Sequence, residues 1–402
     1  MADIRISNVG PDVSSQFSEL MTAQKTAIIE LTSTYGLSDL RDIVTTTGTG
    51  TVTNNATEFV LTTAGAADSA ILDSAERGRY EPGYACESGI AVRQPAAPVG
   101  NQTAQWGLYD SQNGAFFGNS STGIFVGIRR AGTDTLIPQA SWNVDPLNGT
   151  GPSGATLDLT DGNIFLIVFT WYGYGVIEFR VVVPNPATLA QDVITVHRFD
   201  PTGQTSFTDP NLPLRAEVEN NGTAAPFNLF VGGRQYSIIG KFEPVFRNTS
   251  ERRTVSNITT TLTPLISFTR KPVFPAGSGR PNSVQVLFES AEIITNVDLA
   301  FQVIIGGTLN GSFTTYPTAT TNIPNNETAL LVNTTSTTIT GGEVVFQGLA
   351  AASGSSSTRV LTTELLLDTE LPDNEIVTLA VASLGGPGTN TVTAMFRVTE
   401  NW

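Results

Sequence analysis

The chain has 402 residues, of which 14% are charged, and its formal net charge at pH 7 is −15. A chain of this length predicts two or three domains with sizeable cores. Its acidity disfavours phosphate backbones and anionic lipid headgroups, so we expect neither a nucleic-acid partner nor a membrane partner. The longest apolar run, residues 164–169, is too short to span a bilayer. The N-terminus lacks the basic start and apolar stretch of an export signal.

Two residue types that carry much enzyme and metal chemistry are nearly missing. Cys86 is the single cysteine and His197 the single histidine. These counts exclude an internal disulfide and a cysteine-based zinc site, and they nearly exclude a histidine-based triad or metal site. His197 lies in a strand-like run, VITVHRF, and we expect it to be an ordinary strand residue facing a neighbour. We therefore expect no catalytic residues, no bound metal and no cofactor.

One segment near the N-terminus has helical periodicity. From Val13 to Tyr35, apolar or near-apolar side chains recur every three or four residues, which predicts one face of a helix. Pro11 and Asp12 supply a start, and Gly36 supplies a stop. The predicted stripe consists of Val13, Phe17, Leu20, Gln24, Ala27, Ile28, Leu31 and Tyr35.

Two interpretations of this stripe are open, because it could pack on its own β-domain or on copies of itself. A polar Gln24 at a stripe position is typical of a short oligomer-forming stalk, so we favour self-association. Residues 1–43 are then an attachment or trimerisation element. Its expected interface residues are Val13, Phe17, Leu20, Gln24, Ile28, Leu31 and Tyr35.

The rest of the chain is typical of strands joined by tight turns, since it is rich in Thr, Ser, Asn, Gly and Val. Asn113-Gly114 predicts a hairpin with a type I′ turn, and residues 171–175 predict a second turn between two apolar strands. The predicted fold is mainly β: an N-terminal α-helix followed by two antiparallel β-sandwich domains, jelly-roll or lectin-like, at 44–250 and 251–402. Between them lies FRNTSERRTVSNIT. We interpret this segment as a charged linker, with contact to an acidic neighbouring subunit as the alternative.

The string NGTGPSG, residues 148–154, has the spelling of a phosphate-binding loop. A dinucleotide site needs a helix after the glycines, but a β run follows here, and Pro152 removes one of the N–H groups. No Walker lysine follows either. Calcium is a second hypothesis, since Asp145, Asp158 and Asp161 flank the loop, but their spacing matches no D-x-D-x-D-G loop, and Asp161-Gly162 is typical of an ordinary turn. We interpret the string as a structural turn.

Carboxylates on strands are the remaining enzymatic signal. Glu178, Glu217 and Glu219 alternate with apolar residues, which predicts that they face solvent. Paired carboxylates could cleave glycosides, yet no pair is distinguished from the others. We therefore expect the protein not to be an enzyme.

Aromatic residues offer a binding signal instead. Most of the dense cluster formed by Trp106, Tyr109, Phe116 and Phe117 is expected to be core. Trp171, Tyr172 and Tyr174 are different, because the glycine-rich turn that holds them places them near a loop tip. These three are candidate glycan-facing residues.

Several motifs follow one another in a fixed order. They are SAERGRYEPGYACESGIAVR, GLYDSQNGAFFG, WNVDPLNGTGPSGATLDL and TSFTDPNLPLRAEVEN, followed by LTPLISFTRKPVF and ITGGEVVFQG. Over residues 37–402 this order resembles a broad family of virion structural proteins of tailed bacteriophages. The segment WNVDPLNGTGPSGATLDL is its most specific part.

The resemblance implies a non-enzymatic component on the outside of a tailed-phage particle: a tail-fibre, baseplate-associated or capsid-decorating protein. It implies assembly in the host cytoplasm, localisation on the virion, contacts with other virion proteins, and a homotrimer by analogy with phage appendages. The absence of disulfides suits assembly in a reducing compartment. The alternative function is a host-receptor module of the tail that binds surface glycans.

Overall fold

The structure is a computed structural model in which the chain divides into two compact units, Met1–Glu243 (unit 1) and Pro244–Trp402 (unit 2). The residues that it describes are 25–170, 173–184, 190–201, 203–204, 206–240, 247–318, 325–352, 371, 375–386 and 388–401.

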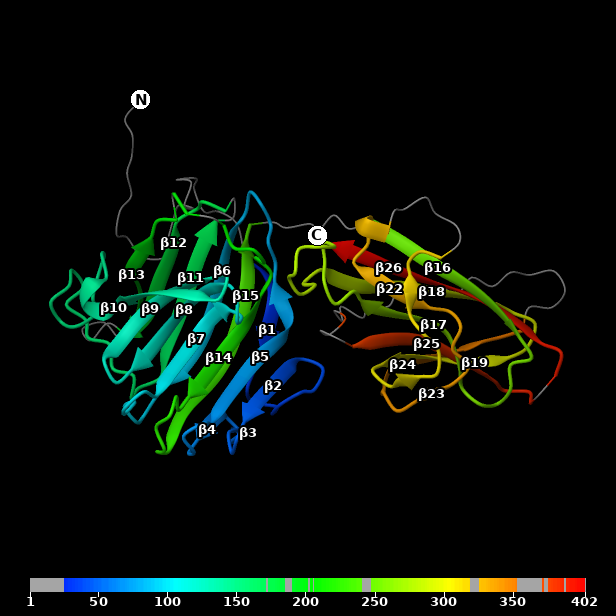
Figure 1. Cartoon of the computed structure of the whole chain (residues 1–402), viewed down its shortest axis with the longest axis horizontal. Coiled ribbons are helices and arrows are strands. Elements are labelled where there is room, and N and C mark those ends of the chain that lie inside the picture. The colour runs from blue at the N-terminus through cyan, green and yellow to red at the C-terminus, as the bar shows by residue number, and fades with distance from the viewer. Residues whose placement is uncertain are drawn as a thin grey trace, which may run out of the picture. The chain divides into compact units, whose positions relative to one another are not determined.

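Unit 1 is a sandwich of two antiparallel sheets (Figure 1). The eight-stranded back sheet comprises β1 Lys25–Leu31, β3 Thr51–Asn54, β4 Phe59–Thr63, β6 Ala85–Arg93, β11 Asn163–Thr170, β12 Ile177–Pro184, β13 Gln191–Phe199 and β15 Phe227–Ile239. Its order is β13-β12-β11-β6-β15-β4-β3, with β1 also pairing β15. The seven-stranded front sheet comprises β2 Asp42–Thr47, β5 Ser69–Gly78, β7 Thr103–Tyr109, β8 Gly114–Ser120, β9 Gly123–Arg130, β10 Thr133–Pro138 and β14 Leu212–Glu219. Its order is β10-β9-β8-β7-β14-β5-β2.

The core of unit 1 lies between these sheets, because alternate side chains of most strands point inward. Phe117 of the front sheet lies against Phe165 of the back sheet, with ring centroids 4.9 Å apart. Trp106 packs against the same Phe165 at 5.0 Å. Each fully buried ring stabilises the fold by roughly 1.5–3 kcal/mol. The prediction of a mainly antiparallel β-sandwich is confirmed here.

Unit 2 is also built from antiparallel sheets (Figure 1). A three-stranded sheet has the order β16-β26-β18, from β16 Arg247–Ser256, β18 Gln285–Thr295 and β26 Thr391–Asn401. A six-stranded sheet has the order β21-β22-β17-β25-β19-β24, from β17 Thr263–Arg270, β19 Leu299–Ile305, β21 Thr314–Thr315, β22 Leu330–Asn333, β24 Glu343–Ala350 and β25 Ile376–Ser383. A separate pair is formed by β20 Thr308–Leu309 and β23 Ile339–Thr340. Phe268 of β17 and Phe396 of β26 pack with centroids 5.8 Å apart, which joins the two larger sheets.

The predicted N-terminal helix is wrong over the residues that can be compared. Lys25–Leu31 is strand β1 and pairs with β15, so Ile28 and Leu31 belong to the back sheet. Ile29, absent from the helical stripe, is 0% exposed, whereas Tyr35 is 90% exposed in a turn. A free length of β15 next to β4 accepts β1 as a strand, and this pairing overrides the local helical spacing. Val13, Phe17, Leu20 and Gln24 lie outside the described residues.

The segment interpreted as a linker is largely strand. Arg247–Ser256 forms β16, which pairs along its length with β26, so the expected 250/251 boundary falls inside a strand. Arg253 is tied down within unit 2, because its Nη1 donates to the carbonyl oxygens of Pro264, Leu265 and Ser336 at 2.9–3.0 Å. A guanidinium that satisfies three carbonyls is structural rather than a free linker charge.

The two predicted turns have different outcomes. β7 and β8 form the expected hairpin, but its loop is the four-residue stretch 110–113. Asn113 lacks the positive φ of a type I′ turn; instead Asp110 Oδ1 accepts hydrogen bonds from the backbone N–H groups of Gln112 and Asn113. The second turn joins β11 and β12, which pair antiparallel. The described residues contain two short 3-10 helices, η1 Gln139–Ser141 and η2 Asn325–Glu327, and no helix among them is long and apolar enough to span a membrane.

Candidate functional site

The NGTGPSG loop is organised by one buried carboxylate. Asp145 Oδ1 accepts from the backbone N–H of Leu147 at 2.9 Å, and Oδ2 accepts from that of Ser153 at 2.7 Å. A Cβ on Gly151 would lie 2.1 Å from Asp145 Oδ1, so only glycine fits there. The glycines therefore let the chain close around its own carboxylate, in agreement with the structural-turn interpretation. Among the described residues no cluster of His, Cys, Asp and Glu is arranged to hold a metal ion.

The preceding Trp-Asn pair is structural as well. Trp142 packs edge-on against Phe117, with centroids 6.4 Å apart. Asn143 clamps β13, because its side chain donates to the carbonyl of Arg198 at 2.8 Å and accepts from the N–H of Arg198 at 2.8 Å. The N–H of Asn143 donates to Nδ1 of His197 at 3.2 Å. Burial lowers the pKa of His197. His197 is thus a neutral strand residue, as expected, that holds a loop.

The aromatic loop candidates are only partly covered by the structure. Trp171 and Tyr172 lie outside the described residues. Tyr174 is described and is 61% exposed. Its exposure is compatible with a ligand contact but does not by itself define a site.

The strand carboxylates face outward, as alternation predicts, but two of them are not solvated. Glu178 and Glu217 are each 8% exposed. Glu178 pairs with Arg180 and with Arg198, whose Nε lies 2.8 Å from Oε1. The expectation of solvent-facing side chains is therefore wrong for these two. Glu219 is partly exposed.

Glu217 and Glu219 belong to the outward face of the front sheet, the face turned away from the core. Strand register aligns the side chains of this face in rows that cross the sheet. The first row is made only of hydroxyl and carboxylate side chains: Thr47, Ser69, Glu219, Thr103 and Ser120. We call it the polar row. All five are partly or fully exposed, and each also makes a hydrogen bond within the chain: Thr47 with Ser69, Glu219 and Thr103 with Asn221, and Ser120 with Thr122.

Aromatic rings lie flat on the same face. Phe116 and Phe125 cover the glycines of neighbouring strands, since a Cβ on Gly127 would be 2.4 Å from the ring of Phe116 and one on Gly118 would be 2.4 Å from that of Phe125. Tyr109 packs against Phe116 with centroids 4.8 Å apart. The three rings are buried. They form a floor rather than a stacking surface.

Guanidinium groups cover this floor. The guanidinium carbons of Arg129 and Arg215 lie 5.4 and 5.5 Å from the ring centroid of Tyr109. Arg215 binds Asp73 through two hydrogen bonds of 2.7 Å, and Arg129 binds Asp134 in the same forked manner at 2.7 and 3.0 Å. Forked pairs of this kind fix the orientation of both partners. The outward face is therefore rigid, and it carries positively and negatively charged side chains next to one another.

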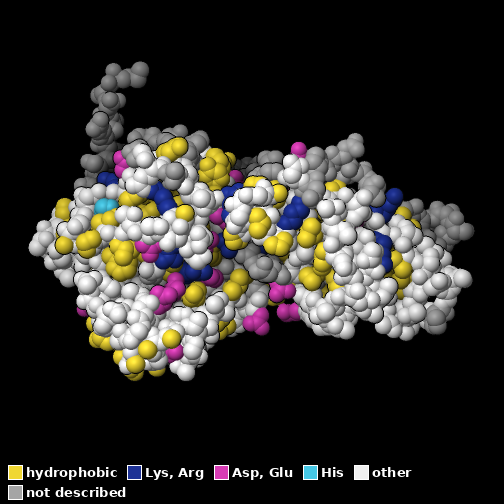
Figure 2. Space-filling view, viewed as in Figure 1, with side chains coloured by type: hydrophobic (Ala, Val, Ile, Leu, Met, Phe, Trp, Pro, Cys, Tyr) yellow, Lys and Arg dark blue, Asp and Glu magenta, His cyan; other side chains and the backbone are white. Residues whose placement is uncertain are grey.

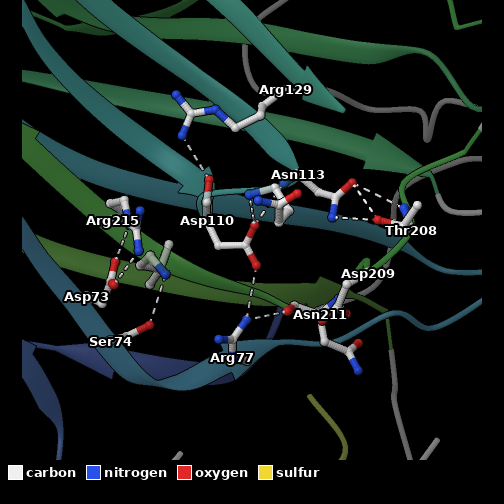
Figure 3. A network of polar contacts seen from close by, with 12 residues as sticks. Asp73, Ser74, Arg77, Asp110, Asn113, Arg129, Thr208, Asp209, Asn211 and Arg215 are labelled. Atoms are coloured by element: carbon white, nitrogen blue, oxygen red, sulfur yellow. Dashed lines mark hydrogen bonds and ion pairs between the residues drawn. The ribbon is translucent and has the colours of Figure 1, made fainter. Parts of the chain in front are cut away.

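Further polar contacts hold the end of the front sheet at which the β7–β8 turn lies. Figure 3 shows Asp110 at their centre, with Arg129 donating to its carbonyl oxygen at 3.0 Å and Arg77 pairing with its carboxylate at 3.5 Å. The amide of Asn113 bonds the hydroxyl of Thr208, which ties the loop before β14 to the β7–β8 turn. These contacts position the sheet's edge loops.

Within the part of the chain that the structure describes, Glu217 has no close ion pair, although an arginine of the same face lies near it. The fork of Arg215 is taken by Asp73, so its Nη1 lies 3.9 Å from Glu217 Oε2. Tyr109 donates to the same oxygen at 3.4 Å. Burial, with the negative charge of Glu219 as the next cause, raises the pKa of Glu217 to about 7. The face thus holds a carboxyl that changes charge near neutral pH.

The polar row borders a hollow of about 440 Å³, lined by Thr47, Ala66, Ala67, Asp68, Ser69, Glu219, Asn221 and Gly222. Asp68 braces its wall by accepting from Thr49 and from the backbone N–H groups of Ala64 and Gly65, and these bonds hold the pKa of its carboxyl well below the usual range. Asn221 Nδ2 donates to Thr103 Oγ1 at 3.1 Å. The size is that of a small-ligand site.

In the view of Figure 1 the front sheet lies toward the viewer, and Figure 2 shows unit 1 from that same side. Basic and acidic side chains stand next to one another over the middle of this unit. The hollow, the polar row, and the aromatic floor with the arginines that cover it together form the candidate functional site.

Comparison with known proteins gives fold likenesses only. No protein-family model and no curated protein matches the chain. The carbohydrate recognition domain of Emp46p is 10% identical with a TM-score of 0.34, over 55% of this chain and 100% of that chain. The legume lectin-like domain from Entamoeba histolytica is 10% identical with a TM-score of 0.29, over 50% of this chain and 95% of that one. The binding domain of botulinum neurotoxin DC in complex with SialylT is 11% identical with a TM-score of 0.30, over 54% and 49%. These TM-scores are too low to carry a functional argument.

Sequence reasoning named Glu217 and Glu219 but missed their partners. The signal was present in LRAEVEN, where Arg215, Glu217 and Glu219 alternate and must share one face of a strand. Asp73, Arg129 and the row hydroxyls come from strands far apart in the chain, so nothing local in the sequence brings them together.

Proposed function

We propose that unit 1 binds carbohydrate on the outward face of its front sheet. The observation that carries this proposal is the polar row beside a hollow of about 440 Å³. Sugar hydroxyls donate and accept hydrogen bonds, and the row offers hydroxyls together with the carboxylate of Glu219. A hollow of this size accommodates one or two sugar rings, within the range of small-ligand sites.

Rigidity supports the proposal. The forked ion pairs of Arg129 and Arg215 hold the aromatic floor, which lies farther along the same face of the sheet than the row. Asp68 holds one wall through its bonds to Thr49, Ala64 and Gly65. A site that is already ordered loses little conformational entropy on binding, which favours weakly binding ligands such as sugars.

The charge of the hollow indicates which glycans fit. Its lining contains Glu219 and Asp68 and no Lys or Arg. Acidic sugars would be repelled at this point, so we propose an uncharged glycan as the ligand.

The setting follows from the sequence motifs. We propose that the protein is a non-enzymatic, self-assembling component on the outside of a tailed-phage virion, where glycan binding would serve host attachment. Mass photometry of the purified chain tests the assembly: a mass three times 42.5 kDa is expected. A monomer at micromolar concentration would overturn the trimer.

Glycan-array screening of the full chain, followed by calorimetry with the best oligosaccharide, tests the binding proposal. Replacing Ser69→Ala together with Glu219→Gln is expected to weaken binding at least about tenfold, since each lost hydrogen bond contributes about 1 kcal/mol. The matched control is Glu30→Gln, an exposed carboxylate of the back sheet. Equal loss in the control, or no loss in the double variant, would refute the site.

A further inference from the structure

A second cavity lies between the two sheets of unit 1, at the other end of β14 from the hollow. Leu108, Ala115 and Leu212 of the front sheet line it, together with Phe169 and Ile177 of the back sheet. Its volume is about 20 Å³, which is room for one water-sized or methyl-sized group. Most of the lining is apolar, which suits a methyl group, and Arg130, Thr170 and Ser206 supply its polar part.

One charged side chain, that of Arg130, lines this largely apolar cavity. Arg130 ends β9 on the side of the strand that faces the core, and it lines the cavity. Its guanidinium carbon lies 5.5 Å from the ring centroid of Phe199 and 5.8 Å from that of Phe207. Both rings attract the guanidinium and help to hold it in place.

The Nε–H of Arg130 is buried and has no hydrogen-bond acceptor among the described residues. Burial also lowers the pKa of this guanidinium. A buried donor without an acceptor is unfavourable, so the site is set up for a ligand that brings an acceptor.

We propose that this cavity is a subsite for the acetyl group of an acetylated sugar. The methyl group would occupy the apolar cavity, and the carbonyl oxygen would accept the hydrogen bond of Arg130 Nε. An acetyl group supplies one methyl-sized apolar part and one uncharged acceptor, which are the two requirements of the site. The inference rests on the proposed carbohydrate function and adds a ligand class to it.

The subsite and the hollow are separate. Leu212 begins β14 and lines the cavity, whereas Glu219 ends β14 and lines the hollow. Seven residues of strand correspond to about 23 Å. One sugar ring cannot reach both, so each site can be inactivated without the other.

The test compares N-acetylglucosamine, glucosamine, glucose and glucuronic acid with the full chain, by calorimetry and saturation-transfer NMR. N-acetylglucosamine is expected to bind at least tenfold more tightly than the other three, with its methyl protons receiving the strongest saturation. Arg130→Met removes the donor, and Ser206→Leu places a larger side chain in the lining of the cavity; both are expected to abolish the preference. Glu219→Gln, in the hollow, is expected to leave it unchanged.

The outcomes separate the two proposals. Equal affinity for glucose and N-acetylglucosamine would overturn the acetyl subsite while leaving glycan binding intact. Preference for glucuronic acid would also overturn it, because Arg130 would then bind a carboxylate. Failure of every sugar and every array glycan would overturn the proposed function itself. Unchanged thermal unfolding of Arg130→Met and Ser206→Leu excludes misfolding as the cause of any loss.

Discussion

The hydroxyl of Tyr109 donates a hydrogen bond of 3.4 Å to Oε2 of Glu217, at the centre of the outward face of the front sheet. Both side chains are buried, and the fork of the nearest arginine, Arg215, is occupied by Asp73. Glu217 therefore keeps a proton more readily than an exposed carboxyl does. Because burial raises the pKa of this carboxyl, the charge of the candidate site depends on pH.

The first prediction concerns Glu217. Its pKa is about 7 in the folded protein and 4.5 in its ordinary state, so the folded chain binds the proton more tightly. The corresponding stability is fully present below pH 4.5 and is lost as the pH rises through about 7, by roughly 3 kcal/mol. Urea unfolding at pH 5 and pH 8.5 should show that Glu217→Gln removes this loss. Glu30→Gln, an exposed control, should retain it, and a Glu217→Gln variant with the wild-type pH dependence would contradict the assignment.

The second prediction concerns His197. Its pKa is lowered by burial, so the folded protein binds this proton less tightly than the unfolded chain does. Stability from this group is present above the ordinary value of 6.5 and decreases as the pH falls below it. Because the chain has one histidine, a single imidazole resonance reports the titration by NMR. A midpoint below 6.5 in the folded state is expected; a midpoint above 6.5 would mean that a carboxylate, and not Asn143, faces the ring.

The third prediction concerns the NGTGPSG loop. Gly151→Ala places a Cβ against Asp145 Oδ1, so the carboxylate must leave the backbone N–H groups of Leu147 and Ser153. A loss of about 2 kcal/mol or more is expected from breaking these charged hydrogen bonds. Gly162→Ala is the matched control, since its added Cβ meets nothing within 4 Å. Thermal unfolding measures both variants, and Gly151→Ala is expected to melt at the lower temperature. Similar melting temperatures would show that the loop does not depend on Asp145.

The fourth prediction distinguishes strand β1 from the helix that local periodicity indicates. Ile29→Ala should destabilise unit 1 by about 2–4 kcal/mol, because Ile29 is completely buried in the sandwich core. Tyr35→Ala should have almost no effect, since Tyr35 is exposed in a turn. Denaturant unfolding measures both. The helical stripe predicts the reverse order, with Tyr35 an interface residue and Ile29 outside the stripe.

Strand content and the hairpins were predictable because alternation and turn residues act over a few positions. The WNVDPLNGTGPSG segment was correctly interpreted as a turn for the same reason: Pro152 and the following β run exclude a phosphate loop locally. The Lys25–Leu31 segment failed because its spacing satisfies two periods at once. The partner strand β15, more than 190 positions later in the chain, decides between them.

The candidate site shows the same division between local and distant information. The sequence alone determined that Arg215, Glu217 and Glu219 share one side of a strand, since alternate residues of a strand point the same way. Only the tertiary structure decided that Asp73 pairs with Arg215, that Tyr109 contacts Glu217, and that Glu217 is buried there. Sheet register sets which distant side chains stand next to one another. Burial sets the charge of these side chains. Neither the register of the sheet nor the burial of a side chain is encoded in any short stretch of residues.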